Sequence, residues 1–240
     1  MARPFDAPPS NSPRLRLLLG ELAAPLDGLR LLPALPRQAM RRSVTPRDVL
    51  VLPGWLAADR STSVIRAALA RDGHRVRGWG LGRNRGDVAG AADTLVAQLQ
   101  QHLDRSGRPT DLVGWSLGGT IAREVARRAP DTVRRIVTLG TPLHGSMFTS
   151  FAALYSRSMD EAAREAVERR LATPPTVAIT IIWSKRDGVV QWRAQQDRDN
   201  PWADHVEVRS THIGMTLDPH VLDVIRDRIG SDLTSGIRVT

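Results

Sequence analysis

One serine stands in a sequence that could make its hydroxyl a nucleophile. Ser116 is the third residue of GWSLGG, residues 114–119, which has the spacing G-x-S-x-G. An apolar run that ends at Val113 precedes it, and a helical pattern from Leu117 to Arg128 follows it. At such a strand-to-helix turn the serine hydroxyl is exposed, the glycines avoid collisions with neighbouring backbone, and the helix N-terminus adds partial positive charge. The chemistry that this pattern predicts is attack by Ser116 on an acyl carbon.

A serine hydroxyl is a weak nucleophile unless a base takes its proton and an acid orients that base. Both residue types follow Ser116 in the chain order Ser, Asp, His. Asp187 lies in a turn sequence after an apolar strand pattern, and His212 lies between the last strand pattern and a helix that Asp218 can cap. We therefore predict Asp187 as the acid and His212 as the base.

Other residues remain open as alternatives for these two roles. The fallback acids are Asp197, Asp199 and Asp204, whose polar loop favours exposure to solvent. His144 is the rival base because it also follows a strand end, but it precedes Asp187 and so breaks the chain order.

Two backbone N–H groups are needed to hold the negative charge that develops on the substrate oxygen. One comes from the residue after the nucleophile, which is Leu117. The other comes from the loop after the first strand, where Gly54 permits a turn that presents the Trp55 amide, with Leu56 as the next candidate.

The surroundings of these residues predict an apolar substrate pocket. Five tryptophans lie at or just beyond presumed carboxyl ends of strands, the edge where open α/β sheets bind ligands: Trp55, Trp79, Trp115, Trp183 and Trp192. Their rings either line a pocket or pack the loops together. We expect the pocket to be lined by Leu56, Trp115, His144, Met147 and Val189.

The elements that must position these residues follow from alternating apolar runs and helical patterns, which are typical of a parallel sheet with crossover helices. The predicted fold class is α/β, with a mostly parallel sheet of about six strands and helices on both faces. The expected strands are 49–52, 75–79, 111–113, 135–139, 176–183 and 206–208. The expected helices are 61–72, 87–104, 117–128, 159–171 and 219–229.

Two segments lie outside this alternation. Residues 1–46 form an arm rich in Pro, Arg and Leu, and residues 47–240 form the α/β domain. The arm could dock on the domain, or its basic helix could rest on an anionic membrane surface; Pro25 and Pro33 interrupt the pattern and favour docking. An insertion at about 143–175 could be a small mobile cap or a fixed crossover.

Composition excludes several classes of protein. The formal net charge is +9, but the charges are spread along the chain and aromatic residues are only 4%, so we expect no nucleic acid partner. The absence of cysteine excludes disulfides, thiolate-bound zinc, iron–sulfur clusters and a cysteine nucleophile. With no secretory segment or membrane span visible, we expect a cytoplasmic protein that could associate with a membrane through its arm.

Taken together, these motifs resemble the α/β-hydrolase superfamily, and specifically its bacterial lipase-like and esterase-like members, over about residues 47–230. The resemblance rests on PGW at 53–55, GLGRNRG at 80–86, GWSLGG at 114–119, LGTP at 139–142, Asp187-Gly188 and His212. It implies a serine hydrolase for carboxylic esters, more for apolar acyl groups than for polar ones, with the triad Ser116, Asp187 and His212. It also implies that no metal or cofactor is required.

Three alternatives stay open from the sequence. The same triad could transfer an acyl group to an acceptor other than water, or the chain could be a non-catalytic binding protein built on a hydrolase scaffold. Residues 80–86 scan loosely as a dinucleotide-binding turn, but their spacing is not G-x-G-x-x-G. We prefer a structured loop there, in which Asn84 ties backbone together.

Overall fold

The computed structural model describes residues 17, 20, 21, 45–143, 173–197, 200 and 203–231. Several predictions fall outside these residues: the helix at 159–171, the rival base His144, the fallback acid Asp199 and the pocket residue Met147. Most of the expected arm and of the expected cap also falls outside them.

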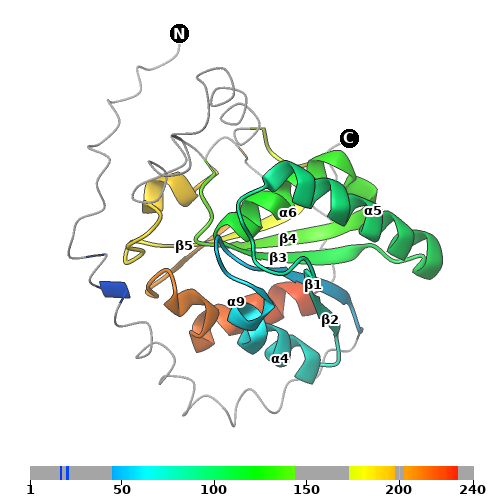
Figure 1. The fold of residues 1–240 in the computed structure, drawn as a ribbon. Coiled ribbons are helices and arrows are strands. Elements are labelled where there is room, and N and C mark those ends of the chain that lie inside the picture. Colours follow the sequence, from blue (N-terminus) through cyan, green and yellow to red (C-terminus); the bar gives the residue numbers. More distant parts are fainter. Residues whose placement is uncertain are drawn as a thin grey trace, which may run out of the picture.

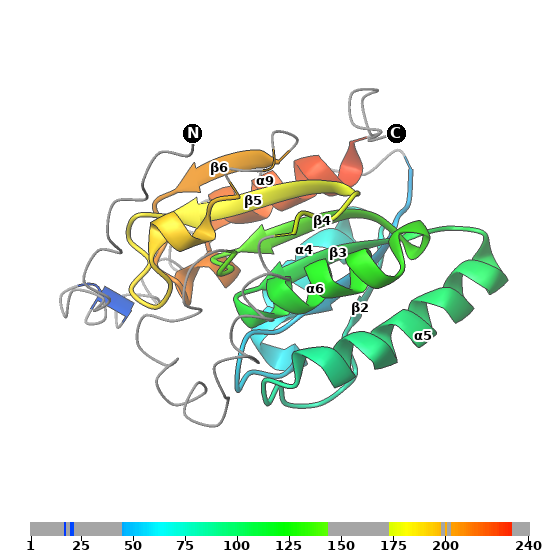
Figure 2. The ribbon, with the colours of Figure 1, turned by 90° about the horizontal axis from the view of Figure 1, so that it is seen from above.

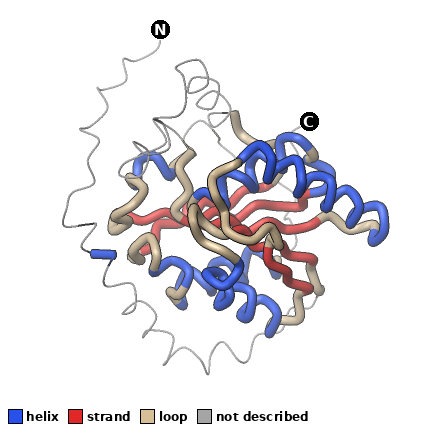
Figure 3. The backbone as a smooth tube through the Cα atoms, in the orientation of Figure 1, coloured by secondary structure: helices blue, strands red, loops and turns tan. Residues whose placement is uncertain are grey.

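Six parallel strands form one sheet, as the sequence predicts (Figure 3). They are β1 (Asp48–Leu52), β2 (Arg75–Gly78), β3 (Thr110–Trp115), β4 (Val133–Leu139), β5 (Ala178–Ser184) and β6 (Asp204–Val208). Their order across the sheet is β2-β1-β3-β4-β5-β6. Each predicted strand is present, with its ends displaced by no more than two residues.

Helices cover both faces of the sheet (Figures 1 and 2). One face carries α5 (Val88–Ser106) and α6 (Leu117–Arg128), and the other carries α4 (Ser63–Arg71) and α9 (Pro219–Gly230). Four short 3-10 turns complete the described elements: η2 (Asp59–Thr62), η3 (Pro130–Thr132), η4 (Trp192–Gln195) and η5 (Gly214–Thr216).

The core is divided into two layers by the sheet. Along β1, Val49 and Val51 belong to the layer under α4 and α9, whereas Leu50 and Leu52 belong to the layer under α5 and α6. Successive side chains of a strand point to opposite faces, and both faces of this sheet are covered. That is why the strand reads as an unbroken apolar run in the sequence.

The strand order reverses at β1. The chain passes from β1 to β2 on one side and then returns to β3 on the other side of β1. Open α/β sheets bind ligands outside the carboxyl ends of the strands where the order reverses in this way. The loop after β1 and the turn after β3 therefore meet at the expected site.

No helix in the described part of the chain is both long enough and apolar enough to cross a membrane.

Candidate active site

Ser116 forms the turn between β3 and α6, and its backbone is held in an unusual conformation. Its φ is +54°, and among the described residues only Leu56 shares a positive φ without being glycine. Such a conformation costs about 1–2 kcal/mol and persists only when neighbours stabilise it. Here the Ser116 N–H donates to the Leu139 carbonyl at 2.8 Å, and the Thr141 hydroxyl donates to the Ser116 carbonyl at 3.0 Å.

Glycines allow the start of α6 to pack closely against the sheet. A Cβ at Gly114 would overlap the backbone of Gly119, and a Cβ at Gly118 would overlap the carbonyl of Leu52. The helix N-terminus is thus pressed against β1 and β3. This is the close backbone approach that the G-x-S-x-G spacing predicts.

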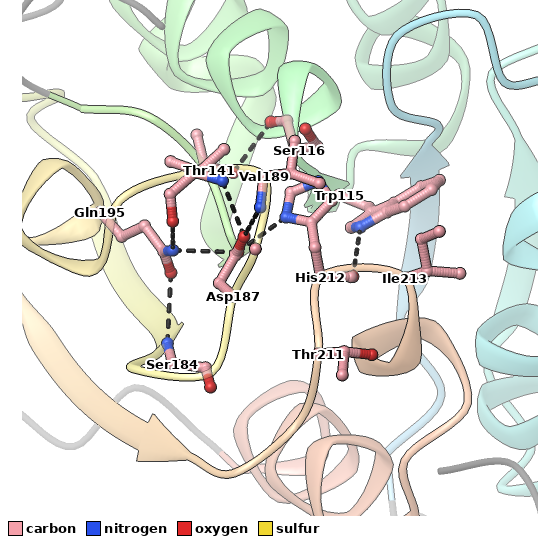
Figure 4. A network of polar contacts seen from close by, with 12 residues as sticks. Trp115, Ser116, Thr141, Ser184, Asp187, Val189, Gln195, Thr211, His212 and Ile213 are labelled. Carbon is pink, nitrogen blue, oxygen red and sulfur yellow. Dashed lines mark hydrogen bonds and ion pairs between the residues drawn. The ribbon is translucent and has the colours of Figure 1, made fainter. Parts of the chain in front are cut away.

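Asp187 and His212 form a buried pair at the carboxyl ends of β5 and β6 (Figure 4). The His212 Nδ1 atom lies 2.7 Å from Asp187 Oδ2, and each residue is 4% exposed. With Asp187 ionised, Nδ1 carries the proton and Nε2 is left as the proton acceptor. The predicted acid and base therefore contact each other as expected.

Neutral donors hold the Asp187 carboxylate in place. The N–H groups of Val189 and Val190 donate to Oδ1 at 2.8 and 2.7 Å. The Gln195 side-chain amide donates to Oδ2 at 2.9 Å. Gln195 is itself fully buried, and its carbonyl oxygen accepts the N–H of Ser184 at 3.3 Å.

The pKa of His212 is raised above its ordinary value of 6.5. Burial by itself lowers this pKa, but the charge of Asp187, its hydrogen bond to the ring and the charge of Glu21 together outweigh burial. The imidazolium that forms when His212 takes a proton is therefore stabilised by these two carboxylates.

Ser116 and His212 lie at the same edge of the sheet (Figure 4). The Trp115 indole N–H donates to the His212 carbonyl at 3.1 Å, and the two rings have centroids 5.6 Å apart. Within the described chain the Ser116 hydroxyl makes no hydrogen bond to the His212 ring. Such hydrogen bonds are often long in unliganded enzymes and tighten when substrate binds.

Gly140 lies directly against the Asp187–His212 pair. Its φ is +56°, and a Cβ placed there would lie 2.9 Å from both Asp187 Oδ2 and His212 Nδ1. Only glycine leaves room for that pair, and the same backbone continues from Leu139, which holds Ser116.

The two fallback acids among the described residues, Asp197 and Asp204, pair with arginines. Asp197 is fully buried and pairs with the fully buried Arg123 at 2.7 Å, so the expectation that it faces solvent is wrong. The reason is that Arg123 lies on the buried side of α6 and requires a counter-charge. Asp204 begins β6 and pairs with Arg228 at 2.6 Å.

The candidate oxyanion donors come from the start of α6 and from the loop after β1. Leu117 is the first residue of α6, so its N–H has no partner within the helix. A Cβ at Gly54 would lie 3.3 Å from Ser116 Cβ, which brings the Gly54–Trp55 loop onto the nucleophile. The Leu56 N–H instead donates to the Asn84 carbonyl at 2.7 Å, so Leu56 is not available as a donor.

Asn84 ties the loops together as predicted. It is buried, its side-chain amide donates to the Pro53 carbonyl at 2.9 Å, and its side-chain oxygen accepts the Gly86 N–H at 3.1 Å. The GLGRNRG segment is thus a structured loop that supports the loop after β1.

The predicted pocket residues have different surroundings. Trp115 contacts the base, Leu56 is 52% exposed, and Val189 donates its N–H to the acid. Ile213, which the sequence analysis did not select, follows His212 and is 44% exposed. The two exposed aliphatic side chains, Leu56 and Ile213, lie in the loops that follow the carboxyl ends of β1 and β6.

Three residues that contact the site were missed in the sequence: Thr141, Gln195 and Glu21. Thr141 belongs to the LGTP motif, but no spacing rule assigns a role to its hydroxyl. Gln195 lies eight residues after Asp187, in η4, with no pattern to mark it. Glu21 is separated from His212 by 191 residues, and its single sequence signal is that it is the one glutamate in the first 46 residues.

Within the described ranges, no group of three His, Asp or Glu side chains is placed to hold a metal ion.

Comparison with known proteins agrees with this fold. The family model described as "alpha/beta hydrolase fold" matches residues 49–187. A pimeloyl-[acyl-carrier protein] methyl ester esterase of Neisseria meningitidis is 44% identical over 50 residues, which are 21% of this chain and 17% of that protein. A triacylglycerol lipase of Pseudarthrobacter phenanthrenivorans is 40% identical over 63 residues, which are 26% of this chain and 20% of that protein.

The match to these two curated relatives thus spans a fifth or less of their length. Among solved structures, the Bacillus licheniformis lipase BlEst2 superposes with a TM-score of 0.62 over 80% of this chain and 95% of that chain, at 13% identity. At this identity the likeness shows the fold alone.

Proposed function

The chain belongs to the family with the α/β-hydrolase fold, and from that premise we propose that it hydrolyses carboxylic esters with Ser116 as the nucleophile. The observation that carries the proposal is the buried Asp187–His212 pair, 2.7 Å apart, at the sheet edge where Ser116 forms the strained turn. The relatives named as a methyl ester esterase and a triacylglycerol lipase support the same substrate class.

Each residue has one role in this proposal. His212 Nε2 takes the hydroxyl proton as Ser116 attacks the ester carbonyl, and it later gives that proton to the leaving alcohol. Asp187 holds the ring in the tautomer with the proton on Nδ1 and stabilises the imidazolium. Water then attacks the acyl-enzyme carbonyl as His212 takes its proton, and His212 returns that proton to Ser116 Oγ as the bond to the serine breaks and the acid leaves.

The oxyanion is held by the backbone N–H groups of Leu117 and Trp55. The position of Leu117 at the start of α6 supports this role, because helix N-termini favour negative charge. Gly54 supports it for Trp55, because a Cβ placed on Gly54 would lie 3.3 Å from Ser116 Cβ, so the loop passes beside the nucleophile. Removal of one such donor typically costs about 10²–10³ in kcat.

The ester carries an apolar acyl group or an apolar alcohol. Leu56 and Ile213 support this assignment, because they are exposed aliphatic side chains on the loops that carry the oxyanion donor and the base. The half-buried ring of Trp115 lies against His212. Binding an apolar chain here would remove these surfaces from water, at about 25 cal/mol for each Å² of apolar area.

Substitution of the nucleophile tests the proposal. Ser116→Ala should lower turnover of p-nitrophenyl esters by about 10⁶-fold and abolish labelling by a fluorophosphonate probe. Ser106→Ala, at the opposite edge of the sheet, is the matched control and should leave both unchanged. Esters of increasing chain length, measured on the wild type, should show turnover rising with acyl length.

Unchanged ester hydrolysis in Ser116→Ala would reject the assignment. Products formed with added competing alcohols would indicate that the acyl group passes to an acceptor other than water.

A further inference from the structure

Glu21, which precedes the α/β domain in the sequence, accepts three backbone hydrogen bonds at the carboxyl ends of the strands. Its Oε1 atom accepts the N–H groups of Gly188 at 2.8 Å and His212 at 2.9 Å. Its Oε2 atom accepts the N–H of Ile213 at 3.0 Å. One carboxylate therefore binds the backbone of the residue after the acid, of the base itself and of the residue after the base.

These three donors belong to two separate loops. Gly188 lies in the turn after β5, and His212 and Ile213 lie in the loop between β6 and η5. In Figure 1 the short blue segment that contains Glu21 lies beside these loops. Apart from Glu21, the Asp187–His212 contact joins the same two loops through side chains. Glu21 is thus a second bridge between them, made from outside both loops.

The bridge has the chemistry of a fixed clamp. Hydrogen bonds from N–H groups to a carboxylate are about twice as strong as those between neutral groups. A half-buried carboxylate with both oxygens engaged restrains the two backbones at three points. Small displacements of a catalytic base are costly, since a shift of about 1 Å can lower a rate by about 10²-fold.

Glu21 also places a negative charge beside the base. Among the described residues, the charged groups that act on His212 are Asp187, through Nδ1, and Glu21, from the backbone side. Both favour the protonated ring, and Glu21 does so without contacting it.

We propose that Glu21 is a positioning residue of the active site: through Gly188, His212 and Ile213 it fixes the loop of the acid relative to the loop of the base. This inference rests on the proposed function. It means that Glu21, a residue from outside the α/β domain, completes the site.

Two substitutions separate the clamp from the charge. Glu21→Ala removes all three acceptors and the charge. Glu21→Gln also removes the charge, but its oxygen can still accept from Gly188 and His212, while its amide group cannot accept from Ile213. A surface carboxylate on β6 gives the matched control, Glu207→Gln, since Glu207 is exposed and pairs with Lys185.

The assay measures kcat, KM and the pH profile of kcat/KM for a p-nitrophenyl ester, together with thermal unfolding. We expect Glu21→Ala to lower kcat by about 10- to 100-fold with little change in KM, and Glu21→Gln to have an intermediate kcat. In both variants the acid limb of the pH profile should move to lower pH, because a negative charge beside His212 is lost. Glu207→Gln should match the wild type in all of these measurements.

The inference is overturned if both Glu21 variants keep the kcat and the acid limb of the wild type. This holds also if only their unfolding temperature falls, because Glu21 would then contribute to stability and not to positioning. If Glu21→Ala does not fold, Glu21→Gln decides by the same two readouts. Failure of the proposed function is recognised separately, because the wild type itself would then lack ester turnover and Ser116-dependent labelling.

Discussion

Two buried histidines lie at opposite ends of the strands: one at the amino edge of the sheet, where the strands begin, and one at the carboxyl edge, where they end. Their pKa values are shifted in opposite directions. His74 precedes β2 at the amino edge, where burial lowers its pKa and the charges of Arg134 and Arg47 add to that effect despite Asp72. His212 follows β6 at the carboxyl edge, where burial also lowers the pKa but the nearby carboxylates outweigh it. Burial is common to both, so the sign of the shift is decided by the neighbours.

Carboxylates show the same contrast between the two edges. At the amino edge, Asp48 accepts hydrogen bonds from Arg75 at 2.7 and 2.9 Å and from Arg108 at 2.9 Å. These guanidinium groups, Arg75 above all, hold the pKa of Asp48 well below its usual range, although burial opposes them. At the carboxyl edge, Asp187 and Glu21 accept mainly from neutral N–H groups.

The difference indicates what the paired arginines at the amino ends of the strands do in this protein. Arginines neutralise carboxylates where the structure needs stability. Neutral donors hold carboxylates where their charge must remain to act on a base. Carboxylates thus stabilise the fold at the amino edge of the sheet and support proton transfer at the carboxyl edge.

Substituting one carboxylate from each edge tests this contrast most strongly. Asp187→Asn should lower kcat by about 10⁴-fold, because the amide no longer selects the tautomer with the proton on Nδ1. Asp48→Asn should keep wild-type kcat but lose about 1–2 kcal/mol of unfolding free energy, since its arginine partners are half exposed. Ester turnover and urea unfolding measure the two effects.

The stability effect at Asp48 has a defined pH dependence. A carboxyl whose pKa is lowered by folding stabilises the protein above its ordinary pKa of 3.8 and loses that contribution as pH falls through its folded value. The gap between Asp48→Asn and the wild type should therefore narrow below about pH 4. A gap that widens on acidification would contradict this account of the amino edge.

A pair of glycines gives the next largest expected effect. Gly140 and Gly107 both have positive φ, at +56° and +65°, but only Gly140 faces the catalytic pair, whereas a Cβ at Gly107 meets nothing within 4 Å. Each substitution by alanine should cost about 1–2 kcal/mol of stability through backbone strain. Gly140→Ala should in addition lower kcat by about 10²-fold by displacing Asp187 and His212. Equal activity in the two variants would show that the pair tolerates an added methyl group.

Titration of the two histidines gives the smallest but most direct comparison. Followed by NMR, His212 should titrate above pH 6.5 and His74 below it. Because the base must be neutral to accept the serine proton, kcat/KM should fall as pH drops through the raised pKa of His212. A shift of both rings in the same direction would remove the contrast between the edges.

Much of the fold follows from local patterns. The central strands β1 and β5 were predictable because they are buried on both faces and are largely apolar, and the edge strands β2 and β6 were predictable although they are partly exposed and alternate charged with apolar residues. The start of α9 was equally clear, since Asp218 caps this helix and Pro219 fits its first position. Ser116 was predictable for a related reason, because its glycines and its place between strand and helix are all local in sequence.

What lies between distant segments was not predictable in this way. Asp197 was expected to face solvent because nothing in its loop indicates the inward-facing Arg123 that pairs with it, 74 residues earlier. Leu56 was a candidate oxyanion donor from the sequence, but its N–H donates to the Asn84 carbonyl, which lies 28 positions away. Gln195 and Glu21 bind the acid and the loops of the site through contacts that no spacing encodes.

The amino-acid sequence by itself determined the order of strands and helices, the nucleophile turn and the most plausible acid and base, because periodicity, capping and glycine placement act over a few residues. Only the tertiary structure decided which groups surround the base, and hence the sign of its pKa shift. Electrostatic interactions and hydrogen bonds depend on distances in space, and in this protein the groups that matter to His212 come from residues 25 and 191 positions away.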